Sequence, residues 1–341
     1  MKILHLGFHL GLSNELYYVS EQLNINMIFK KFTDGVYQDD AKLYNIGHNR
    51  AKLAWDNNKD FYNKFDMIIT SDTCPISRVF LQNNYQGYLI IYVCNRFDYY
   101  DGASLDCKFP DKEYYDLIKG AKERKNVKII SYTEFEHHYA RKYHNINIGY
   151  QVIKPIGKIS DTFKKNNMDF KKIDRKISDT IVKKDLFFVP SYHNDTILLK
   201  LSELLKELGI NNYNGKYKGP EDIIDFKGVI HIPYAWSNLS LFEALQNGII
   251  YFIPSMNFLL KLKTRGNFFW SPPFSIEDLS ISEWYSPYHK NILIYFDSWQ
   301  DLKHKIKSTN YDERKKIIKD FAKQHEEINI DKWKGILFDW K

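Results

Sequence analysis

Short apolar runs alternate along this sequence with stretches of helical periodicity, and this alternation limits the fold more than any other feature. The runs at 66–70 and 88–94 are mostly apolar, and each ends in a polar turn. Strands that are apolar on both faces are typical of parallel sheets covered by helices. The stretch 14–23 instead places its apolar residues at helical spacing. The sequence therefore predicts β-α-β units.

The pattern occurs in two series, separated by a polar, lysine-rich stretch at 157–184. We expect strands at 1–8, 26–29, 66–70, 88–94, 127–131, 185–190, 228–233 and 249–254, and helices at 14–23, 134–143, 195–208, 239–247 and 312–327, the last followed by an aromatic tail with Trp333 and Trp340. The series predict two Rossmann-like domains of the α/β class, 1–156 and 185–341, joined by a linker or excursion at 157–184.

Composition narrows the class of protein. The chain has 341 residues, 49 Lys+Arg against 42 Asp+Glu, a net charge of +7, and three cysteines without a metal-binding spacing. The lysines are spread along predicted helices, so we expect no nucleic-acid partner and at most peripheral contact with a membrane surface. No apolar run approaches the ~20 residues of a membrane span. These features predict a cytoplasmic protein in a reducing compartment.

Ligands of open parallel sheets bind outside the carboxyl ends of the strands. In the first series this rule selects the loops 7–13, 71–73 and 95–98, and in the second series 191–194 and 234–240. The candidates for a catalytic base are His9, Asp72 and Asp98, and the candidates for acceptor binding are Asn95 and Arg96. Taken singly, each of these residues is also explained by a turn or a backbone hydrogen bond.

The stretch 231–254 carries the most informative pattern. A strand leads into the turn Ser237–Asn238, whose side chains can cap the following helix, and the start of that helix offers backbone N–H groups to a phosphate. Glu243 lies on this otherwise apolar helix, where a carboxylate can accept hydrogen bonds from ribose hydroxyls. A capped helix with Glu243 complementing its dipole explains the same pattern, and the residues alone leave both interpretations open.

The run S-N-L-S-L-F-E-A-L-Q-N-G-I-I at 237–250, followed by a strand and Pro254, resembles the donor site of GT-B glycosyltransferases. The resemblance implies two Rossmann-like domains with parallel sheets facing a central cleft, and a last helix that packs back toward the N-terminal domain. It also implies that Glu243 binds the nucleotide ribose and that the turn at 237–240 holds the diphosphate. The expected donor-binding residues are Ser191, His193, Tyr234, Ser237, Asn238, Leu239, Ser240 and Glu243.

Two departures separate this sequence from retaining members of that group. A second glutamate usually precedes the ribose glutamate by about two turns, where this chain has Tyr234-Ala235-Trp236. An arginine and a lysine usually follow the first strand of the second domain, where this chain has 191–194 without either. In this chain the groups left to offset the phosphate charge are His193, helix N-termini, Lys216 or Lys218. Whether the transfer retains or inverts the anomeric configuration stays open.

The expected function is the transfer of a hexosyl or pentosyl group from a UDP- or GDP-linked sugar to a glycan, glycoconjugate or other hydroxyl acceptor. No Asp-x-Asp pair occurs in the sequence, so we expect the reaction to need neither a metal nor another cofactor. A nucleotide-sugar 2-epimerase of the same architecture is the main alternative. A basic protein that binds nucleic acid or a membrane surface ranks last, because the basic residues are not clustered.

Overall fold

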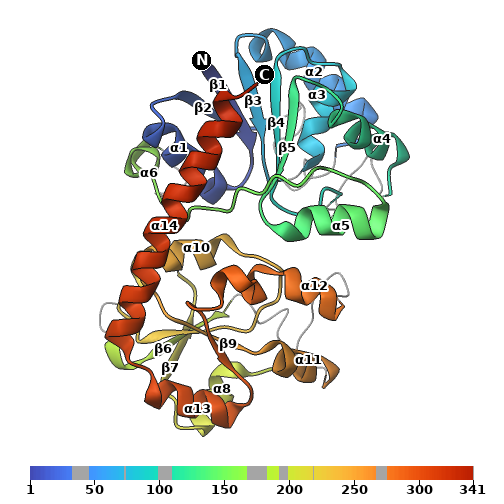
Figure 1. Ribbon diagram of the computed structural model, residues 1–341. Helices are drawn as coiled ribbons and strands as arrows, with labels where there is room; N and C mark the ends of the chain where they lie inside the picture. The colour runs from blue at the N-terminus through green and yellow to red at the C-terminus, as the bar shows by residue number, and fades with distance from the viewer. Residues whose placement is uncertain are drawn as a thin grey trace. The chain divides into compact units, whose positions relative to one another are not determined.

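The computed structural model describes residues 1–32, 46–72, 74–98, 110–166, 183–191, 199–217, 219–265 and 275–340. The chain forms two compact units, each built on a five-stranded parallel sheet (Figure 1). Unit 1 consists of Met1–Pro155, Ile159–Phe163 and Ile328–Lys341, and unit 2 of Ile156–Lys158 and Lys164–Glu327. The predicted class, two Rossmann-like α/β folds with parallel sheets, is confirmed.

The sheet of unit 1 has the strand order β2-β1-β3-β4-β5, and all its strands are parallel. The strands are β1 (Lys2–Gly7), β2 (Asn26–Lys31), β3 (Met67–Thr70), β4 (Tyr88–Val93) and β5 (Val127–Ser131), close to the predicted bounds. The helices are α1 (Leu10–Gln22), α2 (His48–Tyr62), η2 (Cys74–Ser77), α3 (Arg78–Gln82), α4 (Lys112–Ala121), α5 (Glu134–His144) and the start of α6 (Asp161–Asn166). Every residue of β3 is buried, as expected for a central strand covered on both faces.

The sheet of unit 2 has the order β10-β9-β8-β6-β7. Its strands are β6 (Phe187–Pro190), β7 (Asn212–Gly215), β8 (Gly228–Ile230), β9 (Tyr251–Pro254) and β10 (Ile294–Phe296). Its helices are η3 (Lys183–Asp185), α8 (Leu201–Glu207), α9 (Pro220–Ile223), α10 (Leu239–Gln246), α11 (Met256–Thr264), α12 (Ile276–Ile281), η5 (Glu283–Tyr285), η6 (Pro287–His289) and α13 (Trp299–Ser308). Helix α14 (Tyr311–Phe338) begins in unit 2 and ends in unit 1.

Both sheets have the same topology when the strands of each unit are counted along the chain. In each unit the order is second, first, third, fourth, fifth. The second strand lies on one side of the first strand, and the third strand lies on its other side. The chain therefore changes direction across the sheet after the second strand, and a crevice opens between the carboxyl ends of the first and third strands. The crevice of unit 1 therefore lies at the ends of β1 and β3, and the crevice of unit 2 at the ends of β6 and β8.

The sequence-based prediction was wrong about the end of the chain. The last helix extends over Tyr311–Phe338 rather than 312–327, and Trp333 is a buried residue of this helix instead of part of a tail. Its ring meets Tyr92 of β4 edge-on, with 5.2 Å between the ring centroids. The residues around Trp333 are mostly polar, so the apolar residues that α14 buries here, Trp333, Ile336 and Leu337, did not stand out as a helical pattern. No helix in the described part of the chain combines the length and apolar character needed to cross a bilayer.

Other differences have local causes. Strands β7 and β10 were not predicted, because β7 reads Asn-Tyr-Asn-Gly and β10 has only three residues. Of the stretch 157–184, residues 167–182 lie outside the described residues, and α6 and η3 occupy parts of the remainder. The predicted helix at 195–208 falls partly outside the described residues as well, and α8 begins at Leu201.

Within unit 2, helix α10 packs directly on the backbone of residues 156–157. Gly157 has φ +78°, and a Cβ atom there would overlap the carbonyl carbon of Phe242 in α10. Gln246, also on α10, donates from Nε2 to the carbonyl oxygens of Ile156 at 2.9 Å and Ala322 at 3.3 Å. These contacts fix α10 against both the start of unit 2 and α14.

Replacing Gly157 with alanine should therefore destabilise unit 2 strongly. The left-handed backbone costs about 1–2 kcal/mol for an alanine, and the overlap with α10 adds about 1–3 kcal/mol. Gly209→Ala is the matched control, because Gly209 has φ +71° but open space around its Cβ position. Urea unfolding should show a larger loss of stability for Gly157→Ala than for Gly209→Ala. Equal losses would contradict the packing argument.

Candidate functional site

The first crevice, in unit 1, is marked by Asp72, which follows β3 and has an unusual backbone. Its φ is +73°, a conformation that costs a non-glycine residue energy and is held only by its surroundings. The backbone N–H groups of Phe8 and His9 donate to its carboxylate. Burial raises the pKa of Asp72 above its usual value, although His9 and these two N–H groups act in the opposite direction. Its Oδ2 atom has no hydrogen-bond partner among the described residues.

His9 lies in the same crevice, as the N-cap of α1. The backbone N–H of Leu12 donates to its Nδ1 atom at 3.3 Å, and the Ser13 hydroxyl donates to its carbonyl oxygen at 3.1 Å. With Nδ1 acting as acceptor, we assign the ring N–H to Nε2. The exposed Nε2 is then a donor. The geometry therefore fits Asp72 as a proton acceptor and His9 as a hydrogen-bond donor.

A buried histidine that sequence reasoning missed lies directly behind this crevice. His5 of β1 is fully buried, and its Nε2 atom is 2.7 Å from the hydroxyl of Ser71. Burial lowers the pKa of His5 to about 3, so the ring is neutral at physiological pH. The bond ties β1 to the turn that carries Asp72. The only signal in the sequence is a histidine within an apolar strand.

The other predicted residues of unit 1 follow β4 and make contacts within their own surroundings. Asp98 is 8% exposed; its Oδ2 atom accepts from the hydroxyl of Tyr115 at 2.7 Å and lies 3.3 Å from Nε2 of His144. Asn95 accepts from the backbone N–H of Arg96 at 2.8 Å, which stabilises a turn. Arg96 lies over the ring of Tyr139. Catalysis by Asp98 and acceptor binding by Asn95 and Arg96 stay predictions.

The second crevice, in unit 2, contains the start of α10. Asn238 occupies the N-cap position, but its side chain makes no capping hydrogen bond. Its Nδ2 atom instead donates to the hydroxyl of Tyr234 at 2.7 Å, and its Oδ1 atom has no partner among the described residues. The side-chain cap predicted for this turn is thus absent, because the amide of Asn238 is turned toward Tyr234. The first N–H groups of α10, at Leu239 and Ser240, have no acceptor within the helix.

Side chains of α10 and neighbouring loops gather around the buried hydroxyl of Tyr251. Burial raises its pKa well above the usual value, and Tyr217, Glu243 and Tyr234 raise it further. The hydroxyl of Ser240 makes a hydrogen bond to it. Glu243 itself is half-buried on α10. The structure therefore brings four predicted residues, Tyr234, Asn238, Ser240 and Glu243, to one end of the sheet.

The loop between β8 and α10 is held by η5, which the sequence did not predict. The indole Nε1 of Trp284 donates to the carbonyl oxygen of Ala235 at 2.9 Å, and the N–H of Glu283 donates to that of Trp236 at 2.8 Å. His231, at the end of β8, stacks on Trp284 with 4.5 Å between ring centroids. These contacts join residues about 50 positions apart in sequence, so no local pattern could predict them.

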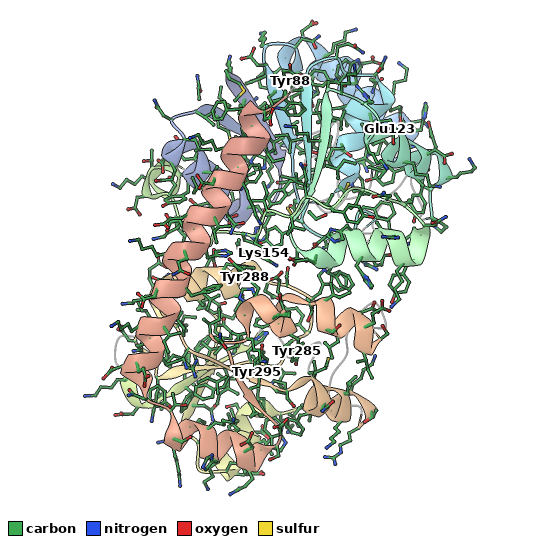
Figure 2. All side chains as sticks on the ribbon, in the orientation of Figure 1. Tyr88, Glu123, Lys154, Tyr285, Tyr288 and Tyr295 are labelled. Carbon is green, nitrogen blue, oxygen red and sulfur yellow. The ribbon has the colours of Figure 1, made fainter. Side chains whose placement is uncertain are left out.

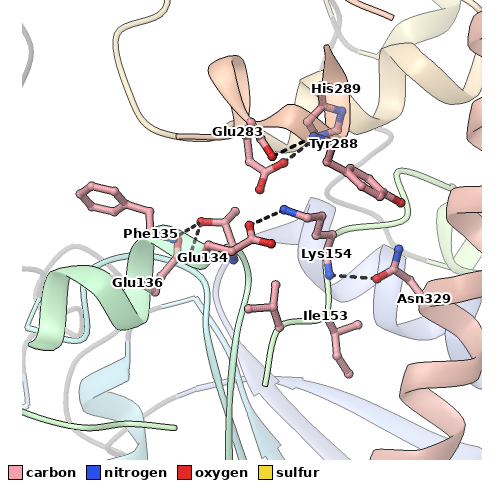
Figure 3. Close-up of polar contacts among 12 residues, drawn as sticks. Glu134, Phe135, Glu136, Ile153, Lys154, Glu283, Tyr288, His289 and Asn329 are labelled. Carbon is pink, nitrogen blue, oxygen red and sulfur yellow. Dashed lines mark hydrogen bonds and ion pairs between the residues drawn. The ribbon is translucent and has the colours of Figure 1, made fainter. Parts of the chain in front are cut away.

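Buried polar groups in turn hold η5. The carboxylate of Glu283 lies 2.6 Å from Nε2 of His289, and both side chains are fully buried (Figure 3). Tyr285 and Tyr295, labelled in Figure 2, stack on each other and donate to the carbonyl oxygens of Pro254 and Trp284, at 2.8 and 2.9 Å. The loop that leads into α10 is therefore fixed by a hydrogen-bonded support.

The remaining predicted residues have less structural definition. Ser191 follows β6, and its hydroxyl has no partner among the described residues. Lys216 is exposed, whereas His193 and Lys218 lie outside the described residues. Within the described ranges, no group of three or more His, Cys, Asp or Glu side chains could hold a metal ion.

No protein-family model and no curated protein matches the sequence. Among solved structures, the chain is similar to HepE of Anabaena in complex with UDP, with 12% identity, a TM-score of 0.43, and coverage of 97% of this chain and 95% of that one. It is also similar to a DNA-modifying β-glucosyltransferase studied with and without uridine diphosphoglucose (10% identity, TM-score 0.43, 98% of each chain). A third is the calicheamicin glycosyltransferase CalG4 (8% identity, TM-score 0.42, 98% of each chain).

The raised pKa of Asp72 leads to a test of the first crevice. A carboxyl group whose pKa is higher in the folded protein binds its proton more tightly there, so its effect on stability becomes unfavourable as pH rises. The difference in unfolding free energy between Asp72→Asn and the wild-type protein should therefore be small near pH 3 and favour the variant increasingly above about pH 4. Urea unfolding at several pH values measures it. A difference that does not change with pH would contradict the burial of this carboxylate.

Proposed function

We propose that this chain is a glycosyltransferase that moves a sugar from a UDP- or GDP-linked donor to a hydroxyl group of a glycan or glycoconjugate. The observation that carries the proposal is the start of α10: its N–H groups have no side-chain cap, and Glu243 follows on the same helix. This helix begins at the point of the sheet where ligands of such folds bind. The resemblance of the sequence at 237–250 to a donor-binding segment supports the same assignment.

The chemistry of a nucleotide diphosphate matches this helix. Its phosphate oxygens accept hydrogen bonds from the N–H groups of Leu239 and Ser240, and the helix dipole favours their charge. Glu243 lies four residues further, a rise of about 6 Å along the helix. Its carboxylate accepts hydrogen bonds from the ribose hydroxyls. The start of α10 also stabilises the diphosphate as it leaves, so we propose that the transfer needs no metal.

Asp72 of unit 1 supplies the base in this proposal. Its raised pKa and its Oδ2 atom suit removal of a proton from an acceptor hydroxyl. The acceptor oxygen then forms a bond to the anomeric carbon as the bond from this carbon to the diphosphate oxygen breaks. The proton stays on Asp72, and the nucleoside diphosphate leaves. The exposed Nε2 of His9, in the same crevice, donates a hydrogen bond to the bound substrate. A single displacement of this kind inverts the anomeric configuration.

Nucleotide binding tests the donor site directly. Calorimetry with UDP, GDP and their glucose conjugates should detect binding by the wild-type protein. Glu243→Ala should weaken that binding by about 1–3 kcal/mol, since it removes a charged acceptor. Glu203→Ala, at an exposed position of α8, is the control and should bind as the wild type does. Folded protein that binds none of these ligands would overturn the proposed function, and unchanged binding by Glu243→Ala would remove Glu243 from the site.

Turnover tests the base. Release of nucleoside diphosphate in the presence of a panel of sugar acceptors should fall about 100-fold or more in Asp72→Asn, while donor affinity stays unchanged. The wild-type rate should rise with pH through the raised pKa of Asp72, because only the carboxylate accepts a proton. The control is Asp116→Asn, at an exposed position of α4. Chelation of divalent cations should have no effect. Donor converted to its epimer without any acceptor would instead identify a 2-epimerase.

A further inference from the structure

A cavity of about 780 Å³ lies in unit 1, beside β5 and away from the residues discussed above. Its walls come from β5, the first turns of α5, residues 150–153 and the last turns of α14. Residues 150–153 run beside the end of β5, where Ser131 and Val152 form a parallel bridge. The volume falls within the range of about 300–1,000 Å³ that is typical of small-molecule sites.

Two lysines from different walls supply positive charge to the cavity. Lys128 of β5 donates from Nζ to the carbonyl oxygen of Ile336 at 3.1 Å and to that of Asp339. Lys332 of α14 donates from Nζ to the carbonyl oxygen of Val152 at 3.1 Å. Neither ammonium has an ion-pair partner in the described part of the chain. Each ammonium has three N–H donors, so Lys332 retains two for a ligand and Lys128 retains one. The Nζ atom of Lys128 also lies 4.2 Å from the centroid of the Trp340 ring.

The acidic groups of the cavity balance this charge incompletely. Glu134 also lines it, but its carboxylate lies 2.5 Å from Nζ of Lys154 (Figure 3). The backbone N–H of Lys154 donates to Oδ1 of Asn329 at 3.1 Å. Asp339 is the other lining acid, and its side chain is exposed. Burial lowers the pKa of both Lys128 and Lys332. A bound anion would offset this cost of desolvation.

Two further side chains suit a ligand with hydroxyl groups and a ring. His137 of α5 has a buried Nδ1 atom without a hydrogen-bond partner among the described residues. Burial lowers its pKa, which favours a neutral ring. Tyr150 is 63% exposed, with its ring centroid 5.8 Å from that of His137. An exposed aromatic ring of this kind offers an apolar face and a polar hydroxyl at the edge of the cavity.

We propose that this cavity binds a sugar-sized molecule that carries an oxyanion, either a carboxylate or a phosphate. The ammonium groups of Lys128 and Lys332 hold the oxyanion, His137 makes a hydrogen bond to a hydroxyl group, and the ring of Tyr150 covers the ligand. The lining of this cavity shares no residue with α10, and the inference does not depend on the function proposed above.

Calorimetry with glucuronate and glucose 1-phosphate tests the proposal, with glucose and inorganic phosphate as comparisons. Saturating UDP and the Glu243→Ala background exclude binding at α10. We expect one anionic sugar to bind with a dissociation constant below about 10 mM, and the tighter of the two identifies carboxylate or phosphate. Lys332→Gln should weaken it about tenfold, since it removes a charged hydrogen bond. Lys334→Gln, at an exposed position of the same helix, should leave it unchanged.

Four outcomes would overturn the proposal: binding of neither anionic sugar, equal binding of neutral glucose, equal binding of inorganic phosphate alone, or unchanged binding by Lys332→Gln. Lys128→Gln provides a second variant, in β5 rather than α14. Circular dichroism of each variant shows whether α14 has kept its helix, so that a loss of binding is assigned to the missing ammonium.

Discussion

The order of strands in two parallel sheets determines where this protein can do chemistry. Parallel strands require crossover connections, so successive strands end at the same edge of the sheet and their loops collect there. In both units the chain reverses its direction of winding between the first and third strands. Asp72 follows the third strand of unit 1, and the loop leading to α10 follows the third strand of unit 2. The same strand order therefore places Asp72 in unit 1 and the start of α10 in unit 2 at equivalent positions of their sheets.

The two crevices share this topology but differ in charge: one contains a carboxylate, and the other contains backbone N–H groups without a side-chain acceptor. In unit 1 the chain provides its own anion: the carboxylate of Asp72 accepts from the N–H groups of Phe8 and His9, and His9 also caps α1. In unit 2 the side chain of Asn238 turns away, and the start of α10 remains without a side-chain cap. A phosphate therefore meets N–H donors in unit 2 and a carboxylate in unit 1. This difference supports donor binding by unit 2 and acceptor activation by unit 1.

Sequence patterns predicted the features that depend on local residues. Apolar runs located the buried strands, and the rule for parallel sheets selected Asp72 and the turn before α10. The short strands β7 and β10 were missed, since β7 is polar and only partly buried. The side-chain cap expected from the turn Ser237–Asn238 is absent, because the amide of Asn238 donates to the hydroxyl of Tyr234, four positions earlier in the same loop. The bonds of His5 to Ser71 and of Trp284 to Ala235 are tertiary, and no spacing in the sequence encodes them.

Each crevice contains a buried polar atom of a predicted site residue that has no hydrogen-bond partner among the described residues. Oδ2 of Asp72 and Oδ1 of Asn238 are buried without a partner among the described residues, and each such atom costs about 1–3 kcal/mol. The positive φ of Asp72 adds strain. The surrounding structure bears these costs, since His5 fixes the turn of Asp72 and η5 fixes the loop before α10. A ligand that supplies hydrogen-bond donors to these two atoms would recover part of the cost, so binding is favoured where the fold alone leaves polar groups unpaired.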